Sequence, residues 1–197
     1  LEKKENVKER AINMILPITA YGDPVLKKRG ADVETDDPKL KTLIEDMFAT
    51  MYHAEGVGLA APQVGMSMRM FVVDSIQIEN PKKTPNFKGI KKAFINPQIL
   101  DETGEEWKYE EGCLSIPGVR GDVFRKPVVK IKYQDESLEW QEEVFDDFNA
   151  RVIQHEYDHI EGILFTDRLA PLKKKMIQGK LNKIMKGTVD VDYRMKF

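Results

Sequence analysis

The sequence predicts an α+β fold in which short antiparallel β-sheets wrap around a central helix, with a further helix toward each end of the chain. Apolar residues recur at helical spacing in three stretches, and segments rich in β-branched and aromatic residues lie between them. No repeat, low-complexity block or shift of composition divides the 197 residues, a length that one hydrophobic core can serve. These observations favour one folded unit built around its middle helix.

The first helix is predicted over residues 37–55. Asp36 or Asp37 can cap its start, and Pro38 suits its first turn. Its apolar residues recur every three or four positions until Gly56 ends the pattern. They are Leu40, Leu43, Ile44, Met47, Phe48 and Met51. This spacing is typical of a helix face that packs on a core.

Strands are predicted at residues 69–74, 93–96, 124–134 and 138–145, where β-branched and aromatic residues concentrate. Asp135-Glu136-Ser137 provides a turn between the last two. Residues 77–92 contain two prolines, one glycine and five lysines, which indicates an exposed loop. The strands therefore fall between the first helix and the second.

The second helix is predicted from Asp147 to Glu161, with Asp146 or Asp147 at its cap and Gly162 after its end. Its apolar Phe148 and Val152 precede the histidines at 155 and 159 by one or two turns, on the same side. We therefore expect this helix to be buried centrally.

The last helix is predicted over residues 172–186, with Ile177, Leu181, Ile184 and Met185 on its packed side. Its other side carries six lysines and no acidic residue. Such a face is usually only solvated, but it could also contact a polyanion such as ribosomal RNA. Beyond it, Val189–Tyr193 alternates in polarity and predicts a short strand.

Composition excludes several classes of function. The net charge of −2 and the pI near 6.0 argue against a protein that mainly binds nucleic acid or anionic membranes. A single cysteine cannot form an intrachain disulfide, which fits a reducing compartment. Residues 1–13 carry seven charged side chains and lack the apolar stretch of a signal peptide. We expect a cytoplasmic protein with an extension at 1–13 and a single catalytic domain at 14–197.

The chemistry of the chain is concentrated in His155-Glu156-Tyr157-Asp158-His159, an HExxH sequence. Residues four apart share a helix face, so both imidazoles can bind one metal ion. Glu156 is then within reach of a water bound to that ion and can act on it as general acid/base. Such catalytic sites hold the ion through three protein ligands and leave one position open.

Cys113 is the preferred third ligand. No histidine follows His159, and the carboxylates downstream do not fall on an obvious helix; they are Glu161, Asp167, Asp190 and Asp192. An alternative is a closed structural zinc site completed by His53, but such sites usually contain closely paired ligands, and the chain has no cysteine pair. A closed site would also leave Glu156 without a role.

Three blocks in this order resemble peptide deformylase, and the resemblance covers residues 15–172. The blocks are Gly56–Gln63 (GVGLAAPQ), Glu111–Ser115 (EGCLS) and Gln154–His159 (QHEYDH). The resemblance implies removal of the formyl group from N-terminal formylmethionine of newly synthesised proteins, with release of formate. It also implies one divalent metal ion held by Cys113, His155 and His159, most often Fe²⁺, with Zn²⁺, Ni²⁺ or Co²⁺ as alternatives.

The same resemblance implies roles for further residues. The side-chain amide of Gln63 and the backbone N–H of Leu114 would stabilise the oxyanion. Substrate backbone would run along Val57, Gly58 and Gly112, because Gly58 lacks a Cβ that would hold it away. The methionine side chain would enter a pocket formed by Tyr109, Arg120, Phe148 and Val152; Phe48 is the alternative to Phe148. Glu111 and Arg125 would form an ion pair behind the site.

Two other functions fit parts of the sequence. An HExxH peptidase that cuts internal bonds would use a third ligand other than Cys113, and a metal-stabilised module attached to the ribosome would not need Glu156. In some deformylases a basic C-terminal helix binds the ribosome, whereas here further residues follow that helix. The expected partners are the formylated nascent chains and, as a possible transient contact through the basic helix at 172–186, the ribosome, with no membrane.

Overall fold

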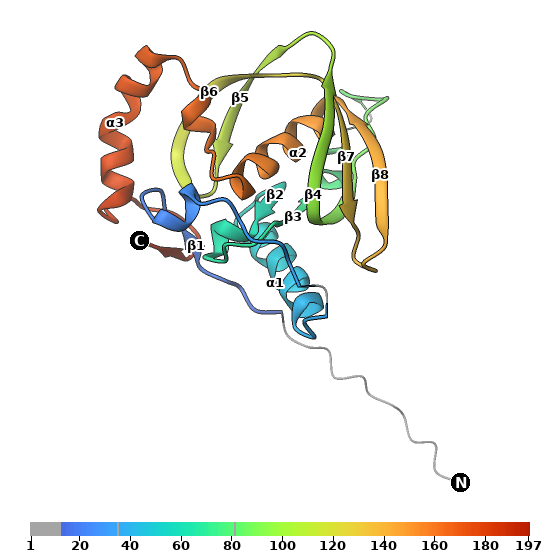
Figure 1. Ribbon diagram of the computed structural model, residues 1–197. Helices are drawn as coiled ribbons and strands as arrows, with labels where there is room; N and C mark the ends of the chain where they lie inside the picture. The colour runs from blue at the N-terminus through green and yellow to red at the C-terminus, as the bar shows by residue number, and fades with distance from the viewer. Residues whose placement is uncertain (1–12, 35, 81) are drawn as a thin grey trace.

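The predicted α+β class is confirmed by a computed structural model that describes residues 13–34, 36–80 and 82–197 (Figure 1). Antiparallel sheets enclose a central helix, α2 (Asp147–Ile160), which carries the HExxH sequence. Most of the predicted extension at 1–13 lies outside the described residues. None of the helices in the described ranges is long and apolar enough to cross a membrane.

The larger sheet has five strands in the order β2-β3-β4-β7-β8, and every neighbouring pair is antiparallel. The strands are β2 (Gly58–Ala60), β3 (Met70–Asp74), β4 (Lys91–Thr103), β7 (Val128–Gln134) and β8 (Trp140–Asp146). The strand predicted at 124–134 is in fact two strands, because Pro127 has no N–H to donate and interrupts the ladder. The strand predicted at 93–96 is part of the much longer β4.

The sheet is packed on both faces. Met70 and Val72 of β3 contact the core beneath helix α1 (Leu40–His53), whereas the alternate residues Phe71 and Val73 contact the core beneath α2. This alternation follows from the pleat of a strand. The expected burial of α2 is confirmed, since this helix packs against β2, β3, β7 and β8.

Helix starts differ from the prediction in detail. The Asp37 carboxylate accepts a hydrogen bond of 2.8 Å from the Lys39 N–H, and α1 begins one residue later, without a side-chain cap. Asp146 precedes α2 as predicted, but its side chain makes no capping hydrogen bond. Both helices are therefore stabilised mainly by the cores that they cover.

The hairpin β5 (Trp107–Cys113) and β6 (Ile116–Arg125) was not predicted. From Val119 to Arg125 every second residue of β6 is buried, but glycines at 118 and 121 and a proline at 117 obscure this alternation in the sequence. The hairpin runs in register from Trp107 opposite Arg125 to Gly112 opposite Arg120, with an irregularity before Cys113. The only cysteine therefore lies at the end of a strand, where the chain turns.

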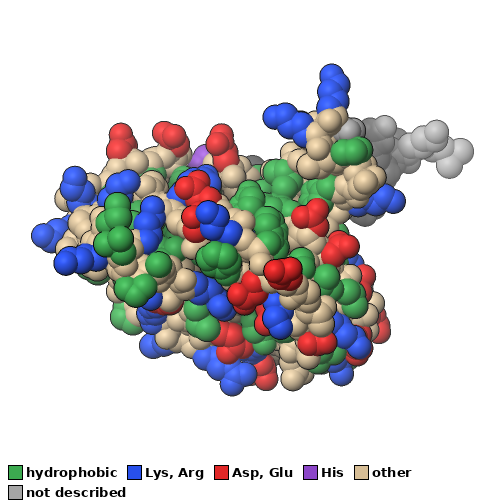
Figure 2. All heavy atoms as spheres, turned by 90° about the horizontal axis from the view of Figure 1, so that it is seen from above, with side chains coloured by type: hydrophobic (Ala, Val, Ile, Leu, Met, Phe, Trp, Pro, Cys, Tyr) green, Lys and Arg blue, Asp and Glu red, His purple; other side chains and the backbone are tan. Residues whose placement is uncertain are grey.

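Helix α3 (Pro171–Met185) packs on β6 through Ile177, Leu181 and Ile184, as predicted, but Met185 is half exposed. Lys and Arg side chains gather at the end of the molecule that α3 forms, at the left in Figure 2. Past the helix, the strand predicted at Val189–Tyr193 is wrong, because these residues are irregular. Instead β9 (Met195–Lys196) forms, where it pairs in parallel with β1 (Ile18–Thr19).

Candidate metal centre

The structure brings Cys113, His155 and His159 together, and one donor atom from each lies within 4.8 Å of the others. Sγ of Cys113 is 3.3 Å from Nε2 of His159, and the two histidine rings, one helical turn apart, have centroids 5.1 Å apart. Donors bound to one ion at about 2.0–2.3 Å have separations of this order. A thiolate with two imidazoles suits a divalent ion of the first transition row. The donor set therefore fits a metal ion.

The alternative ligands lie elsewhere. His53 is exposed at the end of α1 and is not in the group. Glu161 pairs with Arg69 at 2.5 Å, and Asp167 pairs with Lys27 at 2.5 Å. The closed site completed by His53 and the sites completed by Glu161 or Asp167 thus have no geometric support.

Glu111 orients the first histidine. Its Oε2 is 2.9 Å from Nδ1 of His155, which leaves the other ring nitrogen to face the cluster. The expected ion pair with Arg125 is present, with Nε to Oε1 at 2.7 Å and Nη2 to Oε2 at 3.0 Å. Arg151 donates to the same Oε1 at 2.9 Å. Burial alone would raise the pKa of Glu111, but hydrogen bonds from His155 and Arg125 hold it well below its ordinary value.

Sequence reasoning missed the other half of this network. Asp158 accepts a hydrogen bond of 2.8 Å from Arg125 and two of 2.6 Å from Arg168, which lies in the short 3₁₀ turn Phe165–Arg168. The guanidinium of Arg151 also lies 4.4 Å from the ring centroid of Trp107. The one available signal was Asp158 itself, a charged residue inside the third block with no assigned role. The network joins α2 to both strands of the β5–β6 hairpin.

Glu156 points from α2 toward strand β2. It is buried, and its Oε2 has no hydrogen-bond partner among the described residues. Burial therefore raises the pKa of Glu156 to about 7. A Cβ built on Gly58 would lie 2.5 Å from Oε1 of Glu156. A side chain at position 58 would thus displace the Glu156 carboxylate, a reason for glycine that differs from the one inferred from the sequence.

Gln63, in the 3₁₀ turn Ala61–Val64, is directed at the cysteine. Its Oε1 accepts a hydrogen bond of 2.8 Å from the Ala60 N–H, which leaves the NH₂ group 3.4 Å from Sγ of Cys113 and 3.4 Å from Oγ of Ser115. Leu114 follows Cys113 in the turn between β5 and β6. Both candidate oxyanion donors thus lie beside Cys113 of the donor cluster.

Of the predicted substrate residues, Gly112 directly precedes Cys113, and Gly58 approaches Glu156, which directly follows His155. Val57 and Gly58 lie at β2, which is an edge strand of the sheet, and Gly112 faces Arg120 across the hairpin. The rings of Tyr109 and Phe148 make an edge contact with centroids 5.5 Å apart, and Val152 is buried in the same core as Phe148. Arg120 is exposed. Phe48, the alternative to Phe148, instead packs in the core beneath α1.

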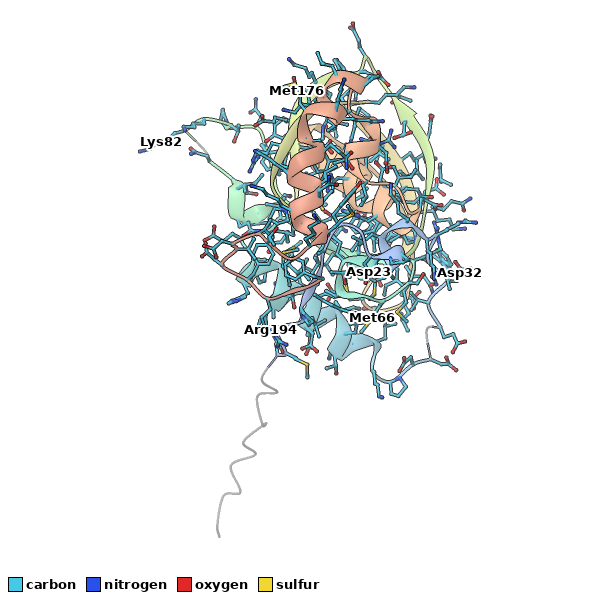
Figure 3. All side chains as sticks on the ribbon, turned by 90° about the vertical axis from the view of Figure 1, so that its left-hand side faces the viewer. Asp23, Asp32, Met66, Lys82, Met176 and Arg194 are labelled. Atoms are coloured by element: carbon cyan, nitrogen blue, oxygen red, sulfur yellow. The ribbon has the colours of Figure 1, made fainter. Side chains whose placement is uncertain are left out.

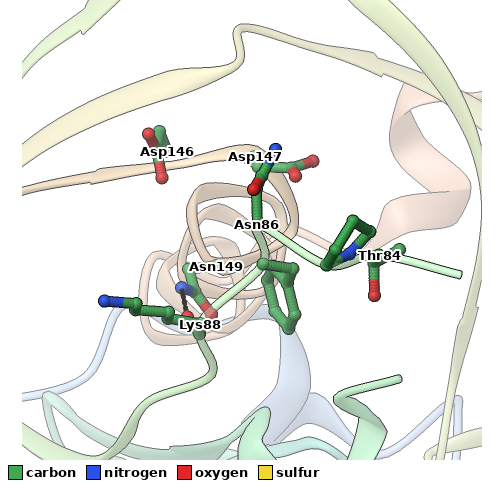
Figure 4. Close-up of a pocket in the computed structure, with 8 residues that line it drawn as sticks. Thr84, Asn86, Lys88, Asp146, Asp147 and Asn149 are labelled. Atoms are coloured by element: carbon green, nitrogen blue, oxygen red, sulfur yellow. Dashed lines mark hydrogen bonds between the residues drawn. The ribbon is translucent and has the colours of Figure 1, made fainter. Parts of the chain in front are cut away.

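A hollow of about 520 Å³ lies at the start of α2, and neither Cys113 nor the two histidines of the donor cluster line it (Figure 4). Residues 84–88 form one wall, and Asp146, Asp147 and Asn149 form the other. Nδ2 of Asn149 donates to the Lys88 carbonyl at 2.8 Å, and Phe87 makes an edge contact with Phe148. The loop predicted at 77–92 therefore borders the region in which the methionine pocket is expected.

The burial of Glu156 predicts a pH-dependent stability for the metal-free protein. Its pKa rises from an ordinary 4.5 to about 7 on folding, so the folded state binds more protons between these values. Stability is therefore lost as pH rises through this window. Metal-free Glu156→Gln should be more stable than the parent by roughly 3 kcal/mol at pH 8, with a difference that shrinks toward pH 4.5. Urea unfolding at both pH values measures this, and an equal difference at both would contradict it.

Comparison with known proteins places these features in one family. The model of the family described as polypeptide deformylase matches residues 15–175. The peptide deformylases of Christiangramia forsetii and Flavobacterium johnsoniae are 56% and 54% identical to the chain over 189 residues, covering 93% of it and 96% of each relative.

Solved structures agree. The crystal structure of a peptide deformylase from Legionella pneumophila superposes with a TM-score of 0.77 at 40% identity, covering 89% of this chain and 98% of that one. A peptide deformylase from Plasmodium falciparum also gives 0.77, at 35% identity, covering 86% and 95%. The chain belongs to the peptide deformylase family and is a hydrolytic enzyme of protein biosynthesis.

Proposed function

We propose that this enzyme removes the formyl group from N-terminal formylmethionine of newly synthesised proteins, releasing formate, and that it depends on one divalent metal ion. Membership of the family supports the reaction. The observation that carries the metal-dependent mechanism is the meeting of all three sequence blocks at one point. The donor cluster consists of Cys113 and the two histidines of α2, and the NH₂ group of Gln63 lies 3.4 Å from the sulfur of Cys113. These residues come from distant parts of the chain.

Glu156 is the proposed general acid/base. When bound, the divalent ion lowers the pKa of a water molecule so that the water is a usable nucleophile near neutral pH. Glu156 accepts a proton from the water that attacks the formyl carbon, and then donates it to the departing amine nitrogen. Burial raises the pKa of the Glu156 carboxyl above its ordinary value, which suits a group that must both accept and donate a proton near neutral pH.

Gln63 and Leu114 are the proposed donors to the oxyanion. The hydrogen bond from the Ala60 N–H restrains the Gln63 amide, so its NH₂ group is already oriented before substrate binds. Donors that are preorganised in this way stabilise the developing charge without a cost of reorganisation. The Leu114 N–H belongs to the turn that carries Cys113, which keeps the second donor beside the metal ligands.

Substitution of Gln63 by alanine should lower kcat by about 10²–10³-fold with little change in KM, because the oxyanion exists only in the transition state. Steady-state kinetics on a formyl-Met peptide measure this. Gln141→Ala is a matched control, since that amide donates to Asp135 in the β7–β8 hairpin. A raised KM with an unchanged kcat would assign Gln63 to substrate binding instead.

For the substrate, we place the peptide backbone along Val57, Gly58 and Gly112, because β2 has a sheet neighbour on one side only and an extended chain could pair with its other side. The methionine side chain would contact Tyr109, Phe148 and Val152, with Arg120 at the rim. The edge contact between the Tyr109 and Phe148 rings supports this, since it brings apolar surface from β5 and α2 together.

The proposed ion is Fe²⁺, with Zn²⁺, Ni²⁺ or Co²⁺ as substitutes, because a thiolate and two imidazoles bind all of these. The proposed partners are formylated nascent chains in the cytoplasm. The exposed lysines of α3 suit a transient contact with the ribosome through its anionic RNA. A single free cysteine fits the reducing conditions of that compartment.

The experiment is formate release from a formyl-Met tripeptide. Protein loaded anaerobically with Fe²⁺, or in air with Ni²⁺, should turn over rapidly. Treatment with a chelator should abolish the activity, and return of the ion should restore it. A fully metallated protein that releases no formate would overturn the proposed function.

A further inference from the structure

The two ends of the described chain meet beside the metal centre. The backbone N–H of Ile18 donates to the Arg194 carbonyl at 2.8 Å, and that of Ala20 donates to the Lys196 carbonyl at 2.8 Å. These bonds form the parallel pair of β1 and β9. Figure 3 shows Arg194 of this segment below α3, at the opposite end from Met176. Residues 186–197 therefore run from α3 back to the body of the enzyme.

Both ends also contact the turn that carries the cysteine. The half-buried Tyr193 donates from its hydroxyl to the Leu114 carbonyl at 2.7 Å, and the Tyr21 N–H donates to the Ser115 carbonyl at 2.8 Å. Cys113 shares an apolar cluster with Met195. The carbonyls of the two residues that follow the metal ligand are thus held by opposite ends of the chain.

We propose that Tyr193 is a positioning residue for the reaction: its hydroxyl holds the Cys113–Ser115 turn so that the thiolate and the Leu114 N–H stay in place. This inference rests on the proposed roles of Cys113 and Leu114. Tyr193 lies beyond residues 15–175, which the family model matches, so the family match itself does not include this contact.

The turn lies next to an irregularity of the hairpin. The register of β5 with β6 shifts between Gly112 and Cys113, and pairing resumes only with Cys113 opposite Ile116. Contacts from outside the hairpin, such as the one from Tyr193, therefore add to the few that fix Leu114 and Ser115. A small displacement of the Leu114 N–H weakens an interaction made in the transition state, so the cost should appear in kcat.

Tyr193→Phe tests the inference because it removes only the hydroxyl. In Ni²⁺-loaded protein, kcat for formate release should fall about 3- to 10-fold, the range for one neutral hydrogen bond, and KM should change less than about twofold. In metal-free protein, amide exchange in residues 113–116 should accelerate. The matched control is Tyr133→Phe, which loses a hydroxyl contact to Glu143 in the β7–β8 hairpin and should change neither quantity.

A Tyr193→Phe enzyme with parental kcat would overturn the inference, as would an equal loss in Tyr133→Phe. Either result would leave the proposed function intact, because the parent enzyme still releases formate. Absence of formate release in the parent would instead refute the proposed function.

Discussion

Glu156→Ala is expected to lower the rate of formate release by about 10³–10⁴-fold while the protein keeps one metal ion per chain. A positioned general acid/base typically contributes 10²–10⁴-fold, and in the proposed mechanism one carboxylate serves both proton transfers. The ligands Cys113, His155 and His159 remain, so the donor cluster is unchanged. Elemental analysis gives the metal content, and single-turnover kinetics give the rate.

Glu139→Ala is a suitable control, since this exposed residue lies in the turn before β8 and should keep parental turnover. If the protein were instead a metal-stabilised binding module, Glu156 would have no catalytic role. Parental formate release by Glu156→Ala would therefore remove the general acid/base from the mechanism and make that alternative the leading one.

Cys113→Ala is expected to abolish both metal retention and activity. Two imidazoles on adjacent turns of α2 remain, but the ion loses its only thiolate ligand. Changes outside the ligand shell already cost about 10–100-fold in affinity or activity at metal sites, so loss of a ligand should cost more than 100-fold. Competition with a chromophoric chelator measures the affinity, and circular dichroism shows whether the variant stays folded.

The same variant separates the enzyme from a peptidase that cuts internal bonds. Such a peptidase would bind its ion through another third ligand, so its metal and its activity would survive Cys113→Ala. A folded variant that keeps the ion and cleaves internal bonds would support that alternative. The positions of Glu161 and Asp167, each paired with a basic side chain, argue for the opposite result.

Features carried by local spacing could be predicted from the sequence. Helix α2 was expected because its period places Phe148 and Val152 with the histidines, and α1 because its apolar residues recur at 3.6-residue spacing. The β5–β6 hairpin could not be predicted in this way, because its inward-facing residues include Gly121 and the charged pair Glu111 and Arg125. Buried charges and glycines make a strand look like a loop.

Long-range pairing accounts for what sequence reasoning missed. Arg168 and Arg125 both reach Asp158, and Arg151 reaches Glu111 from 40 residues away. Nothing in local spacing selects such partners. Strand β9 likewise begins two residues beyond the alternating stretch Val189–Tyr193, at the point where β1 lies alongside the chain. The presence of a strand to pair with thus decides where β9 forms more than the β-propensity of the residues does.

The Glu111 carboxylate, held by two arginines, has a consequence for how the enzyme would acquire the proposed ion. His155 is oriented by a group that is itself immobilised, so its ligand geometry exists before any ion arrives. Loading and exchange can then occur in the folded protein, without the coupled folding that small zinc domains need. If the proposed metal dependence holds, this site would accept any of the late first-row cations that suit a thiolate and two imidazoles, and one cation could replace another without unfolding of the chain.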